Sequence, residues 1–309
     1  MSNKVEIIQG NAIDILKDLQ DQSVDLVIAD PPYNLNKDYG NKSDSKGFDE
    51  YINFTKEWTK EATRILKPTG TIYVFMGFRF ISYLYQILEN DNSLLFNNWI
   101  CWFYTQGIGK KKGFSPRHDD LLMFTKSREF IFNLDEIRVP QKYYRSINNM
   151  RGANPGDVWE FSHVHYCQEN RQNHPTQKPE GLMERMVLAS SNEGDLVVDP
   201  FAGSGTTLRV CQQLNRDCIG IELNHDYVEL IKRRLNEPFT GFDSIDPRME
   251  RVPNDLNDDK IREEYLANHI DWFLKHHNGA KDAFYAEVEK KYGNKIPKDK
   301  REGKQQTLF

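Results

Sequence analysis

Apolar and polar positions follow two alternating patterns through residues 1–237. Short apolar runs, rich in branched residues and without polar alternation, predict buried parallel strands. These runs lie near residues 5–8, 25–30, 71–77, 97–105, 195–199 and 217–222. Between them, apolar residues with helical spacing predict helices near residues 12–20, 48–66, 79–89, 180–191, 205–214 and 224–236. Strands that alternate with helices indicate an open α/β sheet.

Two stretches of the chain depart from this alternation. Residues 119–132 have the pattern of two extended segments, with a hairpin over 118–125, and residues 133–172 are irregular. From residue 238 the pattern predicts a linker, then helices over 257–277 and 279–292, then a disordered polar tail. We therefore expect four parts, which are residues 1–108, 109–172, 173–237 and 238–309.

A carboxylate, two prolines and an aromatic residue, Asp30-Pro31-Pro32-Tyr33, stand where the second apolar run ends. Open α/β sheets bind their ligands at the carboxyl ends of strands. The prolines have fixed φ angles and no N–H donors, so they leave rigid carbonyl acceptors beside a carboxylate and a flat ring. This combination suits an amino group on a stacked base. Taken alone, the four residues are equally consistent with a proline-rich strand exit capped by aspartate.

A second motif, Asp199-Pro-Phe-Ala-Gly-Ser-Gly-Thr-Thr207, connects a short strand to a helix. Glycines in such a strand–turn–helix unit let the backbone approach a nucleotide closely. No lysine follows Gly205, and the G-x-G-x-x-G spacing is absent, so a phosphate loop and a dinucleotide site are both disfavoured. The next strand ends at Glu222, an acid of the kind that accepts hydrogen bonds from a ribose diol.

Together these motifs resemble the S-adenosylmethionine-dependent DNA methyltransferases that methylate exocyclic amino groups. The segment His174-Pro-Thr-Gln-Lys-Pro-Glu180 is similar to the family segment around the methionine end of the cofactor. The catalytic motif precedes the cofactor motif, which is the order of the permuted β class. Over residues 4–236 the resemblance implies a permuted Rossmann-like methyltransferase sheet, with an inserted target-recognition region and a small C-terminal helical appendage. Aspartate before Pro-Pro-Tyr goes mostly with adenine N6, so the resemblance implies a site-specific DNA adenine methyltransferase of a restriction–modification system.

The resemblance assigns catalysis to Asp30, Pro31, Pro32 and Tyr33. Asp30 and the Pro31 carbonyl would accept the two N–H bonds of the adenine amino group and direct its lone pair toward the sulfonium methyl. Tyr33 would stack on a base that has been flipped out of duplex DNA.

The resemblance also implies S-adenosyl-L-methionine as cofactor. Asp199 would contact the amino group of the cofactor, Glu222 would bind its ribose, and Phe201 would pack on its sulfonium. The expected contacts are Asn11, Ala12, Asp30, His174, Pro175, Thr176, Lys178, Asp199, Phe201, Ala202, Gly203, Ser204, Gly205, Thr206, Thr207, Glu222, Leu223 and Asn224. Two alternatives stay open. Thr206 and Thr207 could be helix caps, and His174 and Lys178 could either bind the cofactor carboxylate or cap a helix at the surface.

The net charge of −5 does not exclude a DNA-binding protein, because the charge is unevenly distributed. Residues 109–151 hold ten lysines and arginines against five acids, with Phe114, Tyr143 and Tyr144 between them. Such a stretch is typical of a solvated loop or of a surface that neutralises phosphates. Its position matches the target-recognition region of the family, which favours DNA binding by Lys110, Lys111, Lys112, Arg117, Lys142, Arg145 and Arg151.

Composition and the chain ends add further expectations. No apolar run reaches the ~18 residues of a membrane span, and no signal peptide is evident, so we expect a cytoplasmic protein. The four cysteines show no metal-ligand spacing, so we expect neither zinc nor a disulfide framework. The last five residues, Gln305-Gln-Thr-Leu-Phe309, resemble peptides that dock on the bacterial sliding clamp. Relatives often form dimers, so a homodimer is a further possible partner.

Three other functions are consistent with part of the sequence. A cytosine-N4 DNA methyltransferase would carry both motifs. An RNA or protein methyltransferase of similar fold usually has asparagine in place of Asp30 and has the cofactor motif first. A DNA-binding module without activity would have no need of both motifs. The sequence therefore favours an adenine-specific DNA methyltransferase.

Overall fold

The structure is a computed structural model that describes residues 3–34, 46–104, 107, 109–139, 152–164, 171–172, 174–239 and 241. Its strands are β1 (Val5–Gln9), β2 (Val24–Ala29), β3 (Leu66–Met76), β4 (Leu95–Phe103), β5 (His118–Thr125), β6 (Val158–Glu160), β7 (Leu196–Asp199) and β8 (Asp217–Glu222). Its helices are α1 (Ala12–Asp18), α2 (Phe48–Ile65), α3 (Ile81–Gln86), α4 (Glu180–Ser190), α5 (Thr206–Gln213) and α6 (His225–Leu235), with a π-helical turn η1 (Ile87–Asp91) and a 3-10 turn η2 (Leu134–Glu136). Each strand and helix predicted within residues 1–105 and 180–236 is present.

The described strands form one sheet in the order β1-β8-β7-β2-β3-β5-β4-β6. Neighbours from β1 to β3 are parallel, whereas β5 runs antiparallel to both β3 and β4. The sheet is therefore mixed, and the α/β fold class is confirmed.

Two expectations for the middle of the chain were wrong. Residues 118–125 form the single strand β5 instead of a hairpin, because residues 121–125 are all buried inside the sheet and the chain bends only at 126–129. The stretch predicted to be irregular contains β6, which pairs with β4. With three residues, β6 is too short to show a periodic pattern.

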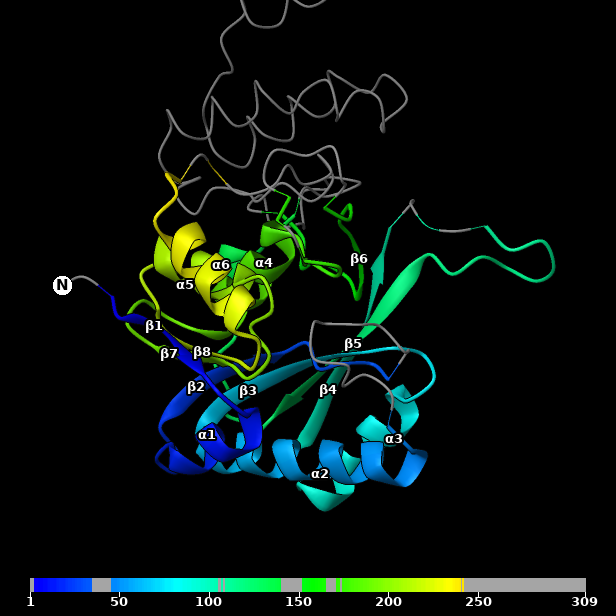
Figure 1. Cartoon of the computed structure of the whole chain (residues 1–309), viewed down its shortest axis with the longest axis horizontal. Coiled ribbons are helices and arrows are strands. Elements are labelled where there is room, and N and C mark those ends of the chain that lie inside the picture. The colour runs from blue at the N-terminus through cyan, green and yellow to red at the C-terminus, as the bar shows by residue number, and fades with distance from the viewer. Residues whose placement is uncertain are drawn as a thin grey trace, which may run out of the picture. The chain divides into compact units, whose positions relative to one another are not determined.

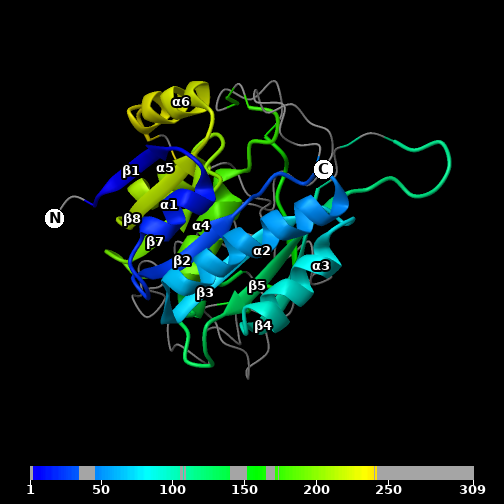
Figure 2. The same ribbon diagram turned by 60° about the horizontal axis from the view of Figure 1, so that its bottom comes forward.

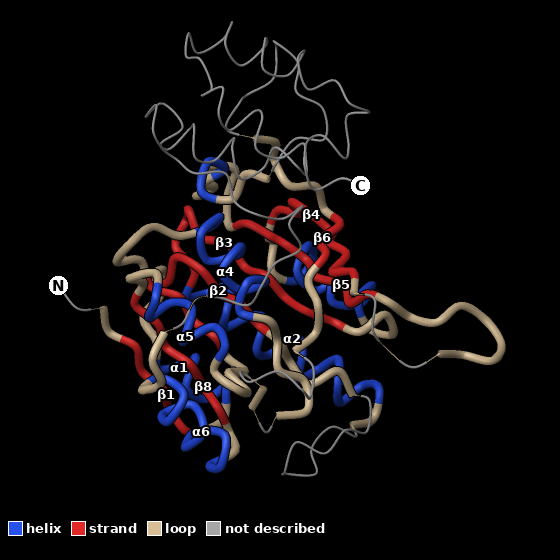
Figure 3. Tube along the Cα trace, turned by 90° about the horizontal axis from the view of Figure 1, so that it is seen from above, coloured by secondary structure: helices blue, strands red, loops and turns tan. Residues whose placement is uncertain are grey.

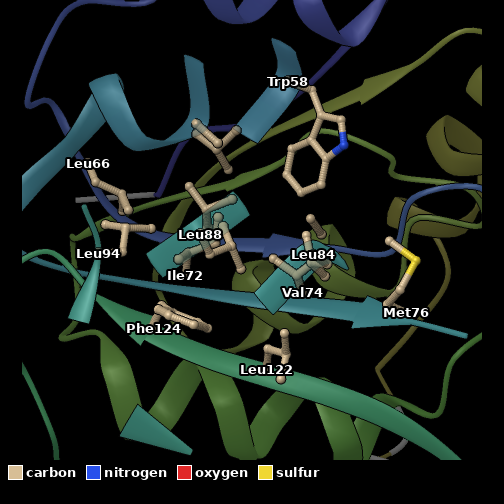
Figure 4. Packing of buried hydrophobic residues seen from close by; sticks show 14 of the residues in the cluster. Trp58, Leu66, Ile72, Val74, Met76, Leu84, Leu88, Leu94, Leu122 and Phe124 are labelled. Carbon is tan, nitrogen blue, oxygen red and sulfur yellow. The ribbon is translucent and has the colours of Figure 1, made fainter. Parts of the chain in front are cut away.

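Helices cover both faces of the sheet. Figures 1 and 2 show α1, α2 and α3 on one face and α4, α5 and α6 on the other. On the first face, Trp58 and Leu84 pack against Ile72, Val74 and Leu122, all of them buried (Figure 4). Every residue from position 70 to the end of β3 is also buried, whichever face it points to. This explains why the central strands are apolar throughout and do not alternate.

A partly buried ion pair links the three central parallel strands. Asp25 of β2 binds Lys67 of β3, with 2.7 Å between Oδ2 and Nζ, and the same oxygen accepts a hydrogen bond from the Leu196 backbone of β7 at 3.0 Å. Because these strands are parallel, their carboxyl ends emerge together at the opposite edge of the sheet. The residues that follow β2 and β7, among them Asp30 and Pro200, therefore become neighbours.

Residues 134–155 and 247–309 cluster as a second compact unit. Its described part contains η2 and a bridge between Val139 and Ala153, and Arg138 donates from Nη1 to the Gly152 carbonyl at 2.9 Å. The expected helices at 257–277 and 279–292 and the tail lie outside the described residues, and the four-part division stays a prediction. No helix in the described ranges combines the length and apolar character needed to cross a lipid bilayer.

Candidate active site

A single pocket brings the two sequence motifs together at the carboxyl ends of β1, β2, β7 and β8. Asp30 and Gly203 are far apart in the chain, but β2 and β7 pair directly, with Leu26 opposite Val197. Both motifs therefore line the same pocket, as the sequence-based hypothesis requires.

Two side chains hold the carboxylate of Asp30. The Tyr33 hydroxyl donates to Oδ1 at 2.7 Å, and the Lys178 ammonium forms an ion pair with Oδ2. The Lys178 side chain is only 7% exposed, and its Nζ lies 5.0 Å from the centre of the Phe75 ring. Lys178 is therefore buried against an aromatic wall, and the alternative of a surface helix cap is wrong for this residue.

A hydrogen bond from helix α2 fixes the loop that follows Asp30. The Tyr51 hydroxyl donates to the Pro32 carbonyl at 2.7 Å. On the other side, a Cβ added at Gly77 would meet the Tyr33 ring at 3.4 Å, which is ordinary contact. The motif Asp30-Pro31-Pro32-Tyr33, called the acceptor motif below, is thus packed between α2 and the end of β3.

The glycine turn after β7 is fixed by the acid at the end of β8. Gly203 has φ +53° and donates its N–H to Glu222 Oε2 at 2.9 Å, while Oε1 accepts from the Asn224 backbone at 2.8 Å. A Cβ at Gly203 would meet the His174 ring at 3.1 Å, so a side chain there would be strained by the backbone conformation and crowded by the imidazole. Burial raises the pKa of Glu222, and these backbone amides oppose that rise.

Two ionisable groups in the pocket have strongly shifted pKa values. Burial raises the pKa of Asp199 to about 7, and the neighbouring Asp30 and Glu222 add to the rise, which the hydrogen bond from the Phe201 backbone opposes. Burial lowers the pKa of His174 to about 4. At neutral pH His174 is therefore an uncharged imidazole, which can hydrogen-bond an anion but brings no positive charge to it.

Comparisons with known proteins agree with this geometry. A family profile described as DNA methylase, for N6 and N4 methyltransferases, matches residues 24–233. The chain is 61% identical over 296 residues to the type II methyltransferase M.HpaI of Haemophilus parainfluenzae, over 96% of this chain and 94% of that protein. It is 37% identical over 244 residues to the DNA adenine methyltransferase YhdJ of Escherichia coli (strain K12), over 74% and 82% of the two chains. The chain belongs to the DNA methylase family.

Solved structures of other methylases share the fold. The complex of M1.HpyAVI with SAM matches with a TM-score of 0.53 at 27% identity, over 74% of this chain and 99% of that one. The cytosine-N4-specific PvuII DNA methyltransferase matches with a TM-score of 0.61 over 87% and 93%; at 19% identity it supports the fold alone. The resemblance seen in the sequence and the prediction of a DNA methyltransferase are both confirmed.

Most of the predicted site residues of this DNA methylase line the pocket. All four residues of the acceptor motif do so, together with Asn11, Ala12, His174, Thr176, Lys178, Asp199, Phe201, Ala202, Gly203, Ser204, Thr206, Thr207, Glu222 and Leu223. Pro175, Gly205 and Asn224 do not. Gly205, at φ +76°, lies against α6, where a Cβ would meet Ile231 at 2.8 Å, and Asn224 caps α6 through the Asp226 backbone at 2.8 Å.

Three lining residues have local partners within the DNA methylase itself. Asn11 caps α1 by accepting from the Ile13 backbone at 2.9 Å. The Phe201 ring packs edge-on against Trp58, with 5.3 Å between ring centres. Thr206 donates to the Lys178 carbonyl at 3.2 Å, and α5 has Gly205 at its N-cap, so the capping alternative is wrong for Thr206.

The pocket of the DNA methylase is also lined by residues outside the predicted set of contacts, which are Gly10, Asn34, Lys46, Tyr51, Phe54, Met183, Pro200, Ile221 and Tyr227. Tyr51, Phe54 and Trp58 share one face of α2 by helical spacing, and this was the available signal. That spacing identifies a buried face but does not distinguish a pocket wall from ordinary core.

The predicted DNA-binding residues that the structure describes lie outside the pocket. Lys110, Lys111 and Lys112 are exposed between β4 and β5, and Arg117 is half-buried, with Nη1 donating to the Pro116 carbonyl at 2.8 Å. Lys142, Arg145 and Arg151 lie outside the described residues.

Proposed function

We propose that the enzyme transfers a methyl group from S-adenosyl-L-methionine to adenine N6 in duplex DNA, as the modification enzyme of a type II restriction–modification system. The observation that carries the proposal is the shared pocket of Asp30 and the glycine turn at Gly203. The names of M.HpaI, a type II methyltransferase, and of YhdJ, a DNA adenine methyltransferase, support it. Aspartate at position 30 supports adenine over cytosine.

The pocket residues fit this cofactor. Two acids, the buried Asp199 and the partly buried Glu222, stand at the ends of neighbouring strands, where one can accept an ammonium group and the other a ribose diol. Each Glu222 oxygen already accepts one backbone N–H but keeps a second lone pair. The absence of a side chain at Gly203 leaves its backbone open to the ligand. When bound, S-adenosyl-L-methionine supplies an electrophilic methyl group.

The acceptor motif prepares the amino group for this reaction. Lys178 and Tyr33 hold the Asp30 carboxylate in place, and its remaining lone pairs can accept an amino N–H. Together with the Pro31 carbonyl, Asp30 orients the nitrogen lone pair and stabilises the positive charge that develops on nitrogen. Alignment of two bound reactants supplies much of the rate, and no covalent bond to the enzyme is needed.

Labelled methyl transfer to duplex DNA, followed by digestion to nucleosides, tests the proposed function. We expect the label in N6-methyladenine. Label in N4-methylcytosine would establish the cytosine alternative, which the same family profile includes. Transfer to neither base would overturn the proposal. Sequencing of the methylated DNA then gives the recognition sequence.

The raised pKa of Asp199 predicts a pH-dependent affinity for the cofactor. An ammonium group binds the ionised carboxylate, and a carboxyl with a pKa of about 7 ionises as the pH rises through neutrality. Affinity should therefore increase roughly five- to tenfold from pH 6 to pH 7.5 by linkage, as measured by calorimetry. Asp199→Asn should remove this dependence. The control Asp195→Asn, at the other end of β7, should keep it, and a flat wild-type profile would contradict the role.

The finer organisation and the other partners stay proposals. They comprise a permuted sheet with its target-recognition region at 109–172, a helical appendage in 238–309, a cytoplasmic location and a homodimer. The expected sliding-clamp peptide, Gln305–Phe309, lies outside the described residues.

A further inference from the structure

The connection between β4 and β5 contains an aromatic side chain, Phe114, that does not pack against the rest of the domain. Phe114 is 99% exposed, the largest exposure among the described large hydrophobic residues. It follows Lys110, Lys111 and Lys112, which are exposed as well. The Lys110 backbone N–H donates to Ser115 Oγ at 2.8 Å, so this hydrogen bond brackets the lysines and Phe114 in one short loop.

The connection is longer than the sheet requires. Antiparallel neighbours such as β4 and β5 are usually joined by two to about five residues, whereas this connection runs from 104 to 117. Figures 1 and 3 show residues 109–117 reaching away from the sheet. Long connections without secondary structure in a compact domain are usually functional. An exposed phenylalanine surrounded by cations suits a partner that offers both phosphates and flat apolar surfaces.

Strand directions place this connection on the pocket's edge of the sheet. Strand β3 is parallel to β2 and antiparallel to β5, and β5 is antiparallel to β4. Strand β4 therefore runs in the same direction as β2. Its carboxyl end, where the connection starts, lies at the same edge as Asp30, which follows β2.

Methylation at Asp30 requires the target base to leave the DNA duplex at this edge of the sheet. The Asp30 side chain is 20% exposed at the pocket, so a base paired inside a duplex cannot bring its amino group to it. The base must leave the stack, which costs a few kcal/mol of unstacking and unpairing. DNA-binding proteins insert apolar side chains, phenylalanine among them, between base steps. An inserted aromatic ring stacks on the neighbouring bases and so replaces part of the stacking that the extruded base loses.

We propose that Phe114 enters the DNA stack beside the flipped base while Lys110, Lys111 and Lys112 bind the adjacent phosphates. The proposal rests on the proposed function, since it requires a base to be extruded from duplex DNA. Phe114 is then a positioning residue, because it stabilises the extruded state without touching the reacting amino group.

A second exposed aromatic on this edge is the rival. Phe78 is 76% exposed and follows the end of β3. It sits in a short turn between β3 and α3, without a cluster of lysines, and Arg79 beside it lies over the Phe80 ring at 5.3 Å. The longer reach and the cations favour Phe114.

The test compares two duplexes that carry the recognition sequence, one fully paired and one lacking the base opposite the target. Removing that partner base makes extrusion cheap. We expect Phe114→Ala to slow single-turnover methylation of the paired duplex by about 5- to 150-fold, the range for one lost stacking contact. On the duplex that lacks the partner base, Phe114→Ala should slow methylation less than about twofold. Phe114→Trp, which keeps an aromatic ring, should restore the rate on both duplexes.

Two further variants, Phe132→Ala and Phe78→Ala, test whether the effect is specific to Phe114. Phe132→Ala, an exposed aromatic that follows β5 at the opposite edge, should match wild type on both duplexes. Because Phe114 is fully exposed, its variants should unfold in urea like wild type. Equal losses on the two duplexes, no loss, or a loss specific to paired DNA in Phe78→Ala alone would each overturn the proposal. Wild-type protein that methylates neither duplex would overturn the proposed function itself.

Discussion

Asp30→Ala should lower the rate of methyl transfer by about a hundred- to a thousandfold, with cofactor affinity nearly unchanged. The carboxylate is the charged acceptor of the acceptor motif, and a preorganised group of this kind typically contributes about 10²–10³ in kcat. Cofactor binding depends mainly on the opposite wall, formed by Asp199, Gly203 and Glu222. Labelled methyl transfer and calorimetry with the cofactor measure the two effects separately.

A surface carboxylate is the matched control for this variant. Asp21 binds Arg64 and precedes β2, at the edge of the sheet opposite the pocket. Asp21→Ala should keep full methyl-transfer activity. Asp30→Ala also leaves Lys178 without its carboxylate, so urea unfolding has to show that the variant is folded. A folded Asp30→Ala protein with wild-type activity would refute the assigned role.

Glu180→Ala should destabilise the protein by about 3–5 kcal/mol, the usual cost of removing one member of a buried ion pair. Glu180 Oε1 lies 3.0 Å from Arg209 Nε and 2.7 Å from Arg234 Nη2, and all three side chains are at least 93% buried. Without the carboxylate, both guanidinium groups stay in the interior without their anion. Urea unfolding measures the loss.

The same network supports the cofactor side of the pocket. Arg234 donates from Nη1 to the Ser204 carbonyl at 2.9 Å and to Thr206 Oγ1 at 3.0 Å. Glu180→Ala should therefore also weaken cofactor binding. Glu180→Gln, which keeps an oxygen acceptor but no charge, should fall between wild type and alanine. The exposed pair of Glu229 and Lys232 is the control, and Glu229→Ala should change nothing measurable. A loss below about 1 kcal/mol for Glu180→Ala would show that the network is not a strong stabilising element.

Much of the fold could be predicted from the chain because its cause is local. Strands β2 and β7 are buried on both faces, so each shows a short apolar run, Leu26–Ala29 and Leu196–Val198, directly before a motif residue. Gly203 has positive φ, which favours glycine, and this requirement is visible in the motif. Strand β6 escaped prediction, since three residues paired at the side of β4 show no period of their own.

Partners across the pocket could not be predicted in this way. The resemblance pointed to Lys178 as a cofactor contact, yet its ammonium pairs with Asp30, a residue of another segment. Tyr51 has the helical spacing of a core residue, and its place in the pocket wall and its hydrogen bond to Pro32 distinguish it from one.

The residue types of the two motifs, and their places at strand ends, follow from the amino-acid sequence, because backbone conformation and burial of single strands act over a few neighbouring residues. The meeting of Asp30 with Gly203 follows from the tertiary structure. It requires β2 to lie beside β7 in parallel. That pairing depends on the packing of helices on both faces of the sheet, and this packing is made by contacts between residues far apart in the chain.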